Sequence, residues 1–122
     1  MIKIVVGGQL AKEKIAELVR RTGGGAVEVT IMQDIQAAMA IKSGSADYYI
    51  GACNTGGGGA LALAIALLGM SLCETLTSPG RSCDEAKITD ALNHGKKAFG
   101  ITEEHVPGVV PMLVKQILAK NQ

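Results

Sequence analysis

The sequence predicts an α/β protein, a three-layer αβα sandwich around a five-stranded parallel sheet. Two observations predict this fold class. Along all 122 residues, short runs of β-branched or apolar residues alternate with longer segments of helical spacing, which is the pattern of repeated βαβ units. Glycine or proline marks most junctions, and no linker divides the chain. We therefore expect one domain that spans residues 1–122.

The first half of the chain is predicted to contain three strands and two helices. The run IKIVV ends at Gly7 and Gly8, and helical spacing then continues to a stop of three glycines. Asp34 is expected to cap the second helix, which Gly44 ends. In order, the predicted elements are strand 2–6, helix 10–25, strand 26–32, helix 35–44 and strand 47–52.

The second half begins with the segment ALALAIALLG, whose alternating large residues fit a helix or a strand. Alanine is the best helix former and is depleted in strands, so we expect a helix. Ser82 and Glu85 predict a capping box, Thr102 is expected to cap a turn, and Pro107 and Pro111 are expected to delay the last helix. The predicted elements are helix 60–69, strand 71–77, helix 82–93, strand 97–101 and helix 110–120.

The alternation of strands and helices also predicts how the strands are arranged. Right-handed crossovers between parallel strands favour the flavodoxin-like order 2-1-3-4-5, with helices on both faces. In such sheets ligands bind at the carboxyl ends of the strands, where the order reverses between the first and third strands. This prediction places Gly7, Gly8 and Gln9 beside the segment 51–59.

Composition excludes several classes of function. The 12 Lys and Arg nearly balance the 11 Asp and Glu, and only three aromatic residues occur, so we expect no nucleic-acid partner. Cys53, Cys73 and Cys83 are odd in number and lack C-x-x-C spacing, which indicates reduced thiols in a cytoplasmic protein and no metal site or cofactor motif. The apolar stretch 56–70 is too short and too glycine-rich for a membrane span.

The segment GACNTGGGG is the first candidate ligand loop. Successive glycines before a helix point backbone N–H groups into one concavity, where the helix dipole adds attraction for a phosphate or carboxylate. No Lys follows the glycines, so a nucleotide P-loop is not indicated. The alternative is that the glycines only allow close helix–sheet packing. The candidate binding residues here are Asn54, Thr55, Gly56, Gly57, Gly58 and Gly59.

Other chemistry-bearing residues follow the predicted strands on the same edge. Cys53, at a strand end before a helix, is a candidate base or nucleophile, or else an inert core thiol. Ser78 and Arg81 follow the fourth strand, and Arg81 supplies the cation that a glycine loop lacks. Glu103 and His105 follow the fifth strand and suit acid–base work, or they complement a helix dipole.

The predicted helix 60–69 is apolar around its whole circumference. A helix between a sheet and water should show a polar stripe, so its outer face needs a cover. We expect a second copy of the chain to cover it, in a homodimer or larger homo-oligomer. The alternative is coverage by neighbouring helices alone.

Two family resemblances add expectations. The segments DIQAAMAIKSGSADYYIGACNTGGGGALALAIALLG and AFGITEEHVPGVVPMLVKQIL resemble the YhfU-like, glycine-rich bacterial family of uncharacterised proteins. That resemblance runs along nearly the whole chain and implies a small cytoplasmic protein working beside transport or metabolic proteins, with no activity to carry over.

The loop Cys53–Asn54–Thr55–Gly56–Gly57–Gly58 is similar to that of ribose-5-phosphate isomerase B. The similarity implies that Cys53 is a base and that Thr55 and the glycines hold a sugar phosphate. Asn54 stands where that family has a glycine, and its Asp-His pair after the first strand is absent.

The sequence as a whole therefore predicts a cytoplasmic protein that binds a small anionic metabolite, of the phosphorylated class, in the 51–59 loop with Arg81 nearby. A sugar-phosphate isomerase with Cys53 as base and Glu103 or His105 as partner acid is one alternative. A non-catalytic interaction subunit of a transport or metabolic system is the other.

Overall fold

The structure is a computed structural model that describes residues 1–55 and 58–122. Strands and helices alternate as predicted, and every strand pair is parallel. Short 3₁₀ helices precede β2, β4 and α5. The main elements are β1 (Ile2–Gly8), α1 (Lys12–Gly23), β2 (Val27–Ile31), α2 (Asp34–Ser43), β3 (Tyr48–Cys53), α3 (Gly58–Leu68), β4 (Cys73–Thr75), α4 (Glu85–Asn93), β5 (Ala98–Thr102) and α5 (Val106–Lys120).

The strand order is β2-β1-β3-β5-β4, so the predicted order 2-1-3-4-5 is wrong at one end of the sheet. The crossover through α3 skips one position, and the chain returns through α4 to place β5 beside β3. The physical reason lies in the two strands. β5 reads AFGIT and is buried along its whole length, whereas β4 has three residues and carries the half-buried Glu74. The shorter, more polar strand therefore occupies the edge.

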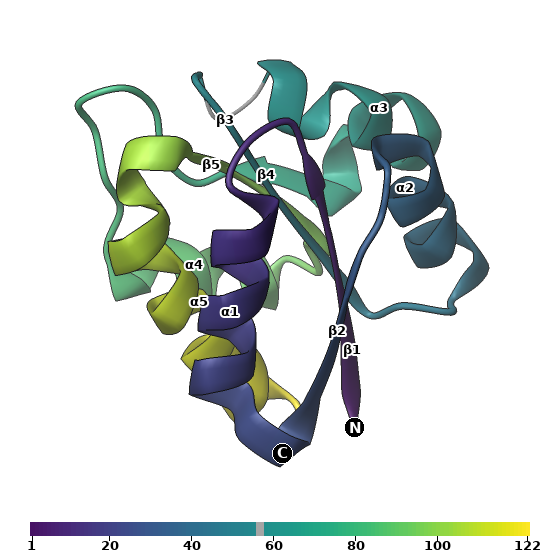
Figure 1. Ribbon diagram of the computed structural model, residues 1–122, viewed down its shortest axis with the longest axis vertical. Helices are drawn as coiled ribbons and strands as arrows, with labels where there is room; N and C mark the ends of the chain where they lie inside the picture. Colours follow the sequence, from purple (N-terminus) through teal and green to yellow (C-terminus); the bar gives the residue numbers. More distant parts are fainter. Residues whose placement is uncertain (56–57) are drawn as a thin grey trace.

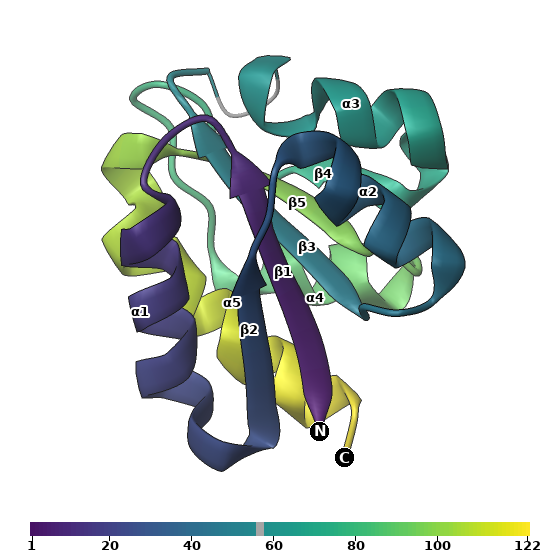
Figure 2. The ribbon, with the colours of Figure 1, turned by 45° about the vertical axis from the view of Figure 1, so that its right-hand side comes forward.

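The helices form two layers, one on each face of the sheet. α1 packs against α5, which also contacts α4, and these three helices cover one face. α2 and α3 pack against each other on the opposite face (Figures 1 and 2). Each layer has its own apolar core, with Ile50 and Phe99 on the first side and Tyr49 and Leu61 on the second. The predicted αβα sandwich is confirmed.

Several predicted helix ends differ in the structure. The Ser82 capping box is wrong, because Asp84 is the N-cap of α4 and its Oδ1 accepts the backbone N–H of Lys87 at 3.0 Å. α5 begins at Val106 rather than Val110, because a proline is tolerated in the first turn of a helix. Asp34 is the first residue of α2 and does not cap it.

Buried Tyr49 attaches α3 to the sheet. Its hydroxyl donates a hydrogen bond to the carbonyl of Ala60 at 2.8 Å. A Cβ on Gly7 would lie 2.8 Å from that hydroxyl, and a Cβ on Gly51 would lie 3.1 Å from the ring. These two glycines therefore provide the space for the aromatic ring. This supports the packing interpretation for Gly51 and gives Gly7, a predicted ligand residue, a packing role.

We expect Tyr49→Phe to lower the free energy of unfolding by about 1 kcal/mol, because it leaves the Ala60 carbonyl without this donor. Burial, followed by the charge of Asp34, raises the pKa of Tyr49 above its ordinary value of 10.0. Tyrosine ionises first in the unfolded chain, so this residue's stabilisation is present below pH 10 and is lost as the pH rises above it. Urea unfolding at pH 7 and pH 10.5 checks both effects, and the deficit of the variant should shrink at the higher pH.

Within residues 1–55 and 58–122, no helix combines the length and apolarity that a membrane span requires.

Candidate functional site

The candidate site lies at the carboxyl edge of the sheet, at the top of Figure 1. The chain leaves β1 toward α1 and β3 toward α3, on opposite faces of the sheet. It also leaves β3 and its neighbour β5 in opposite directions, because α5 lies on the α1 side. Open α/β sheets bind ligands at strand ends where the following loops diverge in this way.

The β1 end of this edge is a tight backbone arrangement. Gly8 has φ +80°, and its N–H donates to Oδ1 of Asp34 at 2.6 Å. The next two amides, those of Gln9 and Leu10, both donate to the carbonyl of Ala52 at 3.0 and 3.1 Å. These contacts fix the end of β1 against β3. They also mean that the Gly8 amide, a predicted ligand donor, is occupied by the Asp34 carboxylate.

The side chain of Gln9 reaches the first turn of α3. A Cβ on Gly59 would collide with the Gln9 amide group, so Gly59 permits that close approach. Gly58 is the first residue of α3. The first N–H groups of a helix have no partner within the helix. In α3 this first turn lies beside the neutral side-chain amide of Gln9. Gly56 and Gly57, also predicted ligand donors, lie outside the described residues.

The Cys53 side chain belongs to the apolar core beneath α3, with Tyr49 and Leu61. It is 2% exposed, and its Sγ lies 3.5 Å from Oγ1 of Thr55. Asn54 and Thr55 themselves are exposed. The predicted polar residues of this loop thus face solvent at the edge, while the thiol is turned into the protein.

Two buried threonines contact each other at the carboxyl ends of β4 and β5. Thr102 is in register with Cys53, and both it and Thr77 are almost fully buried. Oγ1 of Thr77 accepts the backbone N–H of Thr102 at 2.8 Å and lies 2.7 Å from Oγ1 of Thr102. Thr102 occupies the N-cap position of the following 3₁₀ helix, as predicted, but its hydroxyl bonds to Thr77 and makes no capping hydrogen bond.

Ser78 and Arg81 form the ends of a tight turn after β4. Each backbone N–H donates to the carbonyl of the other, at 3.0 and 2.9 Å, and Gly80 has φ +72°. This geometry presents the exposed Arg81 side chain at the carboxyl edge. Pro79 before Gly80 suits such a turn, because proline fixes a negative φ and glycine accepts a positive one.

The segment after β5 touches this turn. Oε1 of Glu104 accepts the N–H of Gly80 at 2.8 Å and lies 3.5 Å from Nε2 of His105. That nitrogen is buried and has no hydrogen-bond partner among the described residues. The structure thus joins His105 to the Arg81 turn through Glu104, whereas Glu103, the predicted acid, is an exposed residue of the 3₁₀ helix Glu103–His105.

Sequence reasoning missed the hydrogen bonds that hold this edge together. It did not name Tyr49 or Thr77, and it assigned Asp34 and Thr102 capping roles in place of their bonds to Gly8 and Thr77. Asp34 carried a signal, since it follows β2 at the same edge as Gly8. The threonine pair carried a weaker one, since each threonine lies at or just beyond the carboxyl end of its strand, and β4 and β5 are neighbours in both the predicted and the observed strand order.

Comparison with known proteins identifies the family. The family model described as "Protein of unknown function DUF2620" matches residues 2–117. The chain belongs to this family. It is 44% identical over 117 residues to "Uncharacterized protein YhfU" of Escherichia coli K12, which covers 96% of this chain and 99% of that protein. The proteins of the same name from Shigella flexneri and E. coli CFT073 have the same identity and coverage.

These relatives support the predicted resemblance to the YhfU-like family along the whole chain. No solved structure matches. The likeness of the 53–58 loop to ribose-5-phosphate isomerase B therefore stays a resemblance of one loop, and the carboxyl edge of this DUF2620 chain has to be interpreted from its own residues.

Proposed function

We propose that the protein binds a small anionic metabolite of the phosphorylated class at the carboxyl edge of its sheet. The observation that carries the proposal is the divergence of the chain after the neighbouring strands β3 and β5, which send α3 and α5 to opposite faces. Between these strand ends, the exposed Asn54 and Thr55 and the N-terminus of α3 offer hydrogen-bond donors to an anion.

Arg81 supplies a positive charge at this edge, where Asp34, Glu103 and Glu104 are negative. Asp34 and Glu104 each accept a backbone N–H, from Gly8 and Gly80 respectively, and such bonds stabilise a carboxylate. None of the ion pairs among the described residues includes Arg81. Its exposed guanidinium can form bidentate hydrogen bonds with a phosphate or carboxylate.

The buried nitrogen of His105 is a second indication of a ligand. A buried polar atom without a partner costs free energy unless a water or a bound group satisfies it. His105 is held beside the Arg81 turn through Glu104. A ligand that bonds to Arg81 and to His105 Nε2 would give the buried nitrogen its missing partner.

The burial of Cys53 favours ligand binding over an isomerase reaction in which Cys53 moves a proton, because that thiol is 2% exposed. The free thiols of Cys73 and Cys83 suit a cytoplasmic location.

A thermal-shift titration tests the proposal with inorganic phosphate, sugar phosphates and small carboxylates as probes. A probe at 100 times its Kd should stabilise the fold by about 2.7 kcal/mol. Arg81→Gln should remove most of that shift. Arg20→Gln, at an exposed position of α1 far from the edge, should leave the shift unchanged.

Two results would contradict the proposal: no shift of the wild type with any of these anions, or an equal shift in wild type and Arg81→Gln. The Arg20→Gln control separates a specific loss from the general effect of removing one positive charge.

A further inference from the structure

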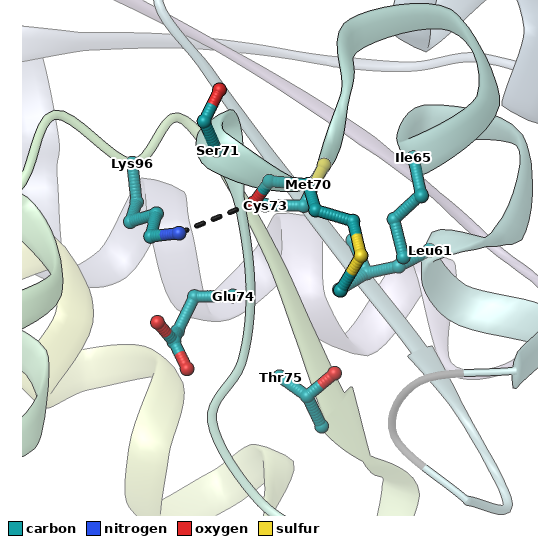
Figure 3. A pocket seen from close by; sticks show the side chains of 8 residues that line it. All are labelled: Leu61, Ile65, Met70, Ser71, Cys73, Glu74, Thr75 and Lys96. Carbon is teal, nitrogen blue, oxygen red and sulfur yellow. Dashed lines mark hydrogen bonds between the residues drawn. The ribbon is translucent and has the colours of Figure 1, made fainter.

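A recess lies between α3 and the edge strand β4 (Figure 3). Its volume is about 500 Å³, and small-molecule sites usually measure about 300–1,000 Å³. Cys73, which lines the recess, is the first residue of β4, and Lys96, which also lines it, precedes β5. The recess therefore lies near the amino ends of these strands, and it is separate from the anion site proposed at their carboxyl ends.

The two sides of the recess differ in chemistry. Leu61 and Ile65 of α3, together with Met70, form an apolar wall. Figure 3 shows the side chains of Lys96 and Glu74 on the side opposite Leu61 and Ile65. In small-molecule sites an apolar wall holds the body of the ligand, and a few polar groups fix its orientation. The lining of this recess has that division.

Lys96 and Glu74 bring one charge of each sign to the recess. No ion pair among the described residues includes either of them. Nζ of Lys96 donates a hydrogen bond to the carbonyl of Met70 at 3.2 Å. That bond holds the ammonium group beside the apolar wall, and an ammonium group has further N–H donors for a ligand. The Glu74 side chain is half-buried, so both charges are placed where a bound molecule can reach them.

We infer that the recess binds a small zwitterion with an apolar side chain, which is the chemical class of the apolar α-amino acids. The carboxylate of the ligand pairs with Lys96, its ammonium group pairs with Glu74, and its side chain packs against the apolar wall. A ligand with only a carboxylate is opposed by Glu74, and a ligand with only an ammonium group is opposed by Lys96. A zwitterion avoids both repulsions.

Isothermal titration calorimetry of the full chain with L-leucine and three analogues tests this inference. Leucinamide lacks the carboxylate, 4-methylpentanoate lacks the ammonium group and glycine lacks the apolar side chain. At about pH 6 the α-amino groups are protonated. We expect saturable binding of leucine, with each analogue bound about tenfold or more weakly.

Two variants assign the charges. In Lys96→Gln, leucine and leucinamide should bind equally weakly, and in Glu74→Gln, leucine and 4-methylpentanoate should do so. Lys14→Gln, at an exposed position of α1 on the opposite face of the sheet, should bind leucine as the wild type does. Circular dichroism establishes that each variant is folded.

Absence of saturable binding of leucine, methionine and phenylalanine to the wild type would overturn the inference. So would a preference for leucine over leucinamide that survives in Lys96→Gln. Lys96 and Glu74 also border a second hollow of about 420 Å³ toward α4, beside Asp90 and His94. Equal affinities for glycine and leucine would indicate that hollow, and would contradict binding against the apolar wall.

Discussion

Gly8→Ala is expected to lower the free energy of unfolding by about 3 kcal/mol or more. Alanine at φ +80° costs about 1–2 kcal/mol in the left-handed region. The added Cβ would also lie 2.6 Å from the backbone nitrogen of Ala52, and relief of that contact requires the ends of β1 and β3 to separate. That movement breaks the bonds from Gln9 and Leu10 to the Ala52 carbonyl.

Gly44→Ala is the matched control for this substitution. Gly44 has φ +82°, and a Cβ there would have nothing within 4 Å. It should therefore lose only the conformational part, about 1–2 kcal/mol. Urea unfolding of both variants measures the difference, and equal losses would mean that the close approach of Gly8 to Ala52 contributes nothing.

Thr77→Val is expected to cost about 2–4 kcal/mol, although valine has nearly the same shape. It removes the acceptor of the buried Thr102 N–H and the hydroxyl partner of the Thr102 side chain. Each buried group left without a partner costs about 1–3 kcal/mol. The change should also reduce anion binding at the adjacent edge, since Thr102 leads directly into the 3₁₀ helix that carries His105.

Thr102→Val is the comparison variant, because it removes a hydroxyl of the same pair without removing the acceptor of the buried N–H. It removes one hydroxyl but keeps the bond from its backbone N–H to Oγ1 of Thr77, so the expected loss is about 1 kcal/mol. Chemical denaturation of the two variants would refute the interpretation if Thr102→Val were as destabilised as Thr77→Val.

The alternation of strands and helices was predictable from the sequence because it depends on local periodicity. Predicted helix ends failed where a neighbouring residue competed for the same role, as Asp84 did with Ser82 for the cap of α4. The predicted order of β4 and β5 was wrong because the lateral position of a strand in a sheet depends on burial across the whole domain. Glu74 in a three-residue strand was the local signal that β4 belongs at the edge.

The candidate site was predictable in outline and not in its contacts. The carboxyl edge and Arg81 followed from the βα pattern. The bonds from Gly8 to Asp34 and from Thr77 to Thr102 join residues 26 and 25 positions apart, and no local pattern encodes such pairs. Burial of Cys53 depends likewise on the path of α3 over β3.

The most direct test of the proposed site is an amide chemical-shift titration of the ¹⁵N-labelled protein with a sugar phosphate. We predict saturable shifts at the amides of Thr55, Gly58, Gly59, Gly80 and His105, with those of α1 and α4 unchanged. Shifts confined to the basic residues of α1, or no saturable shift at the carboxyl edge, would contradict an anion site there.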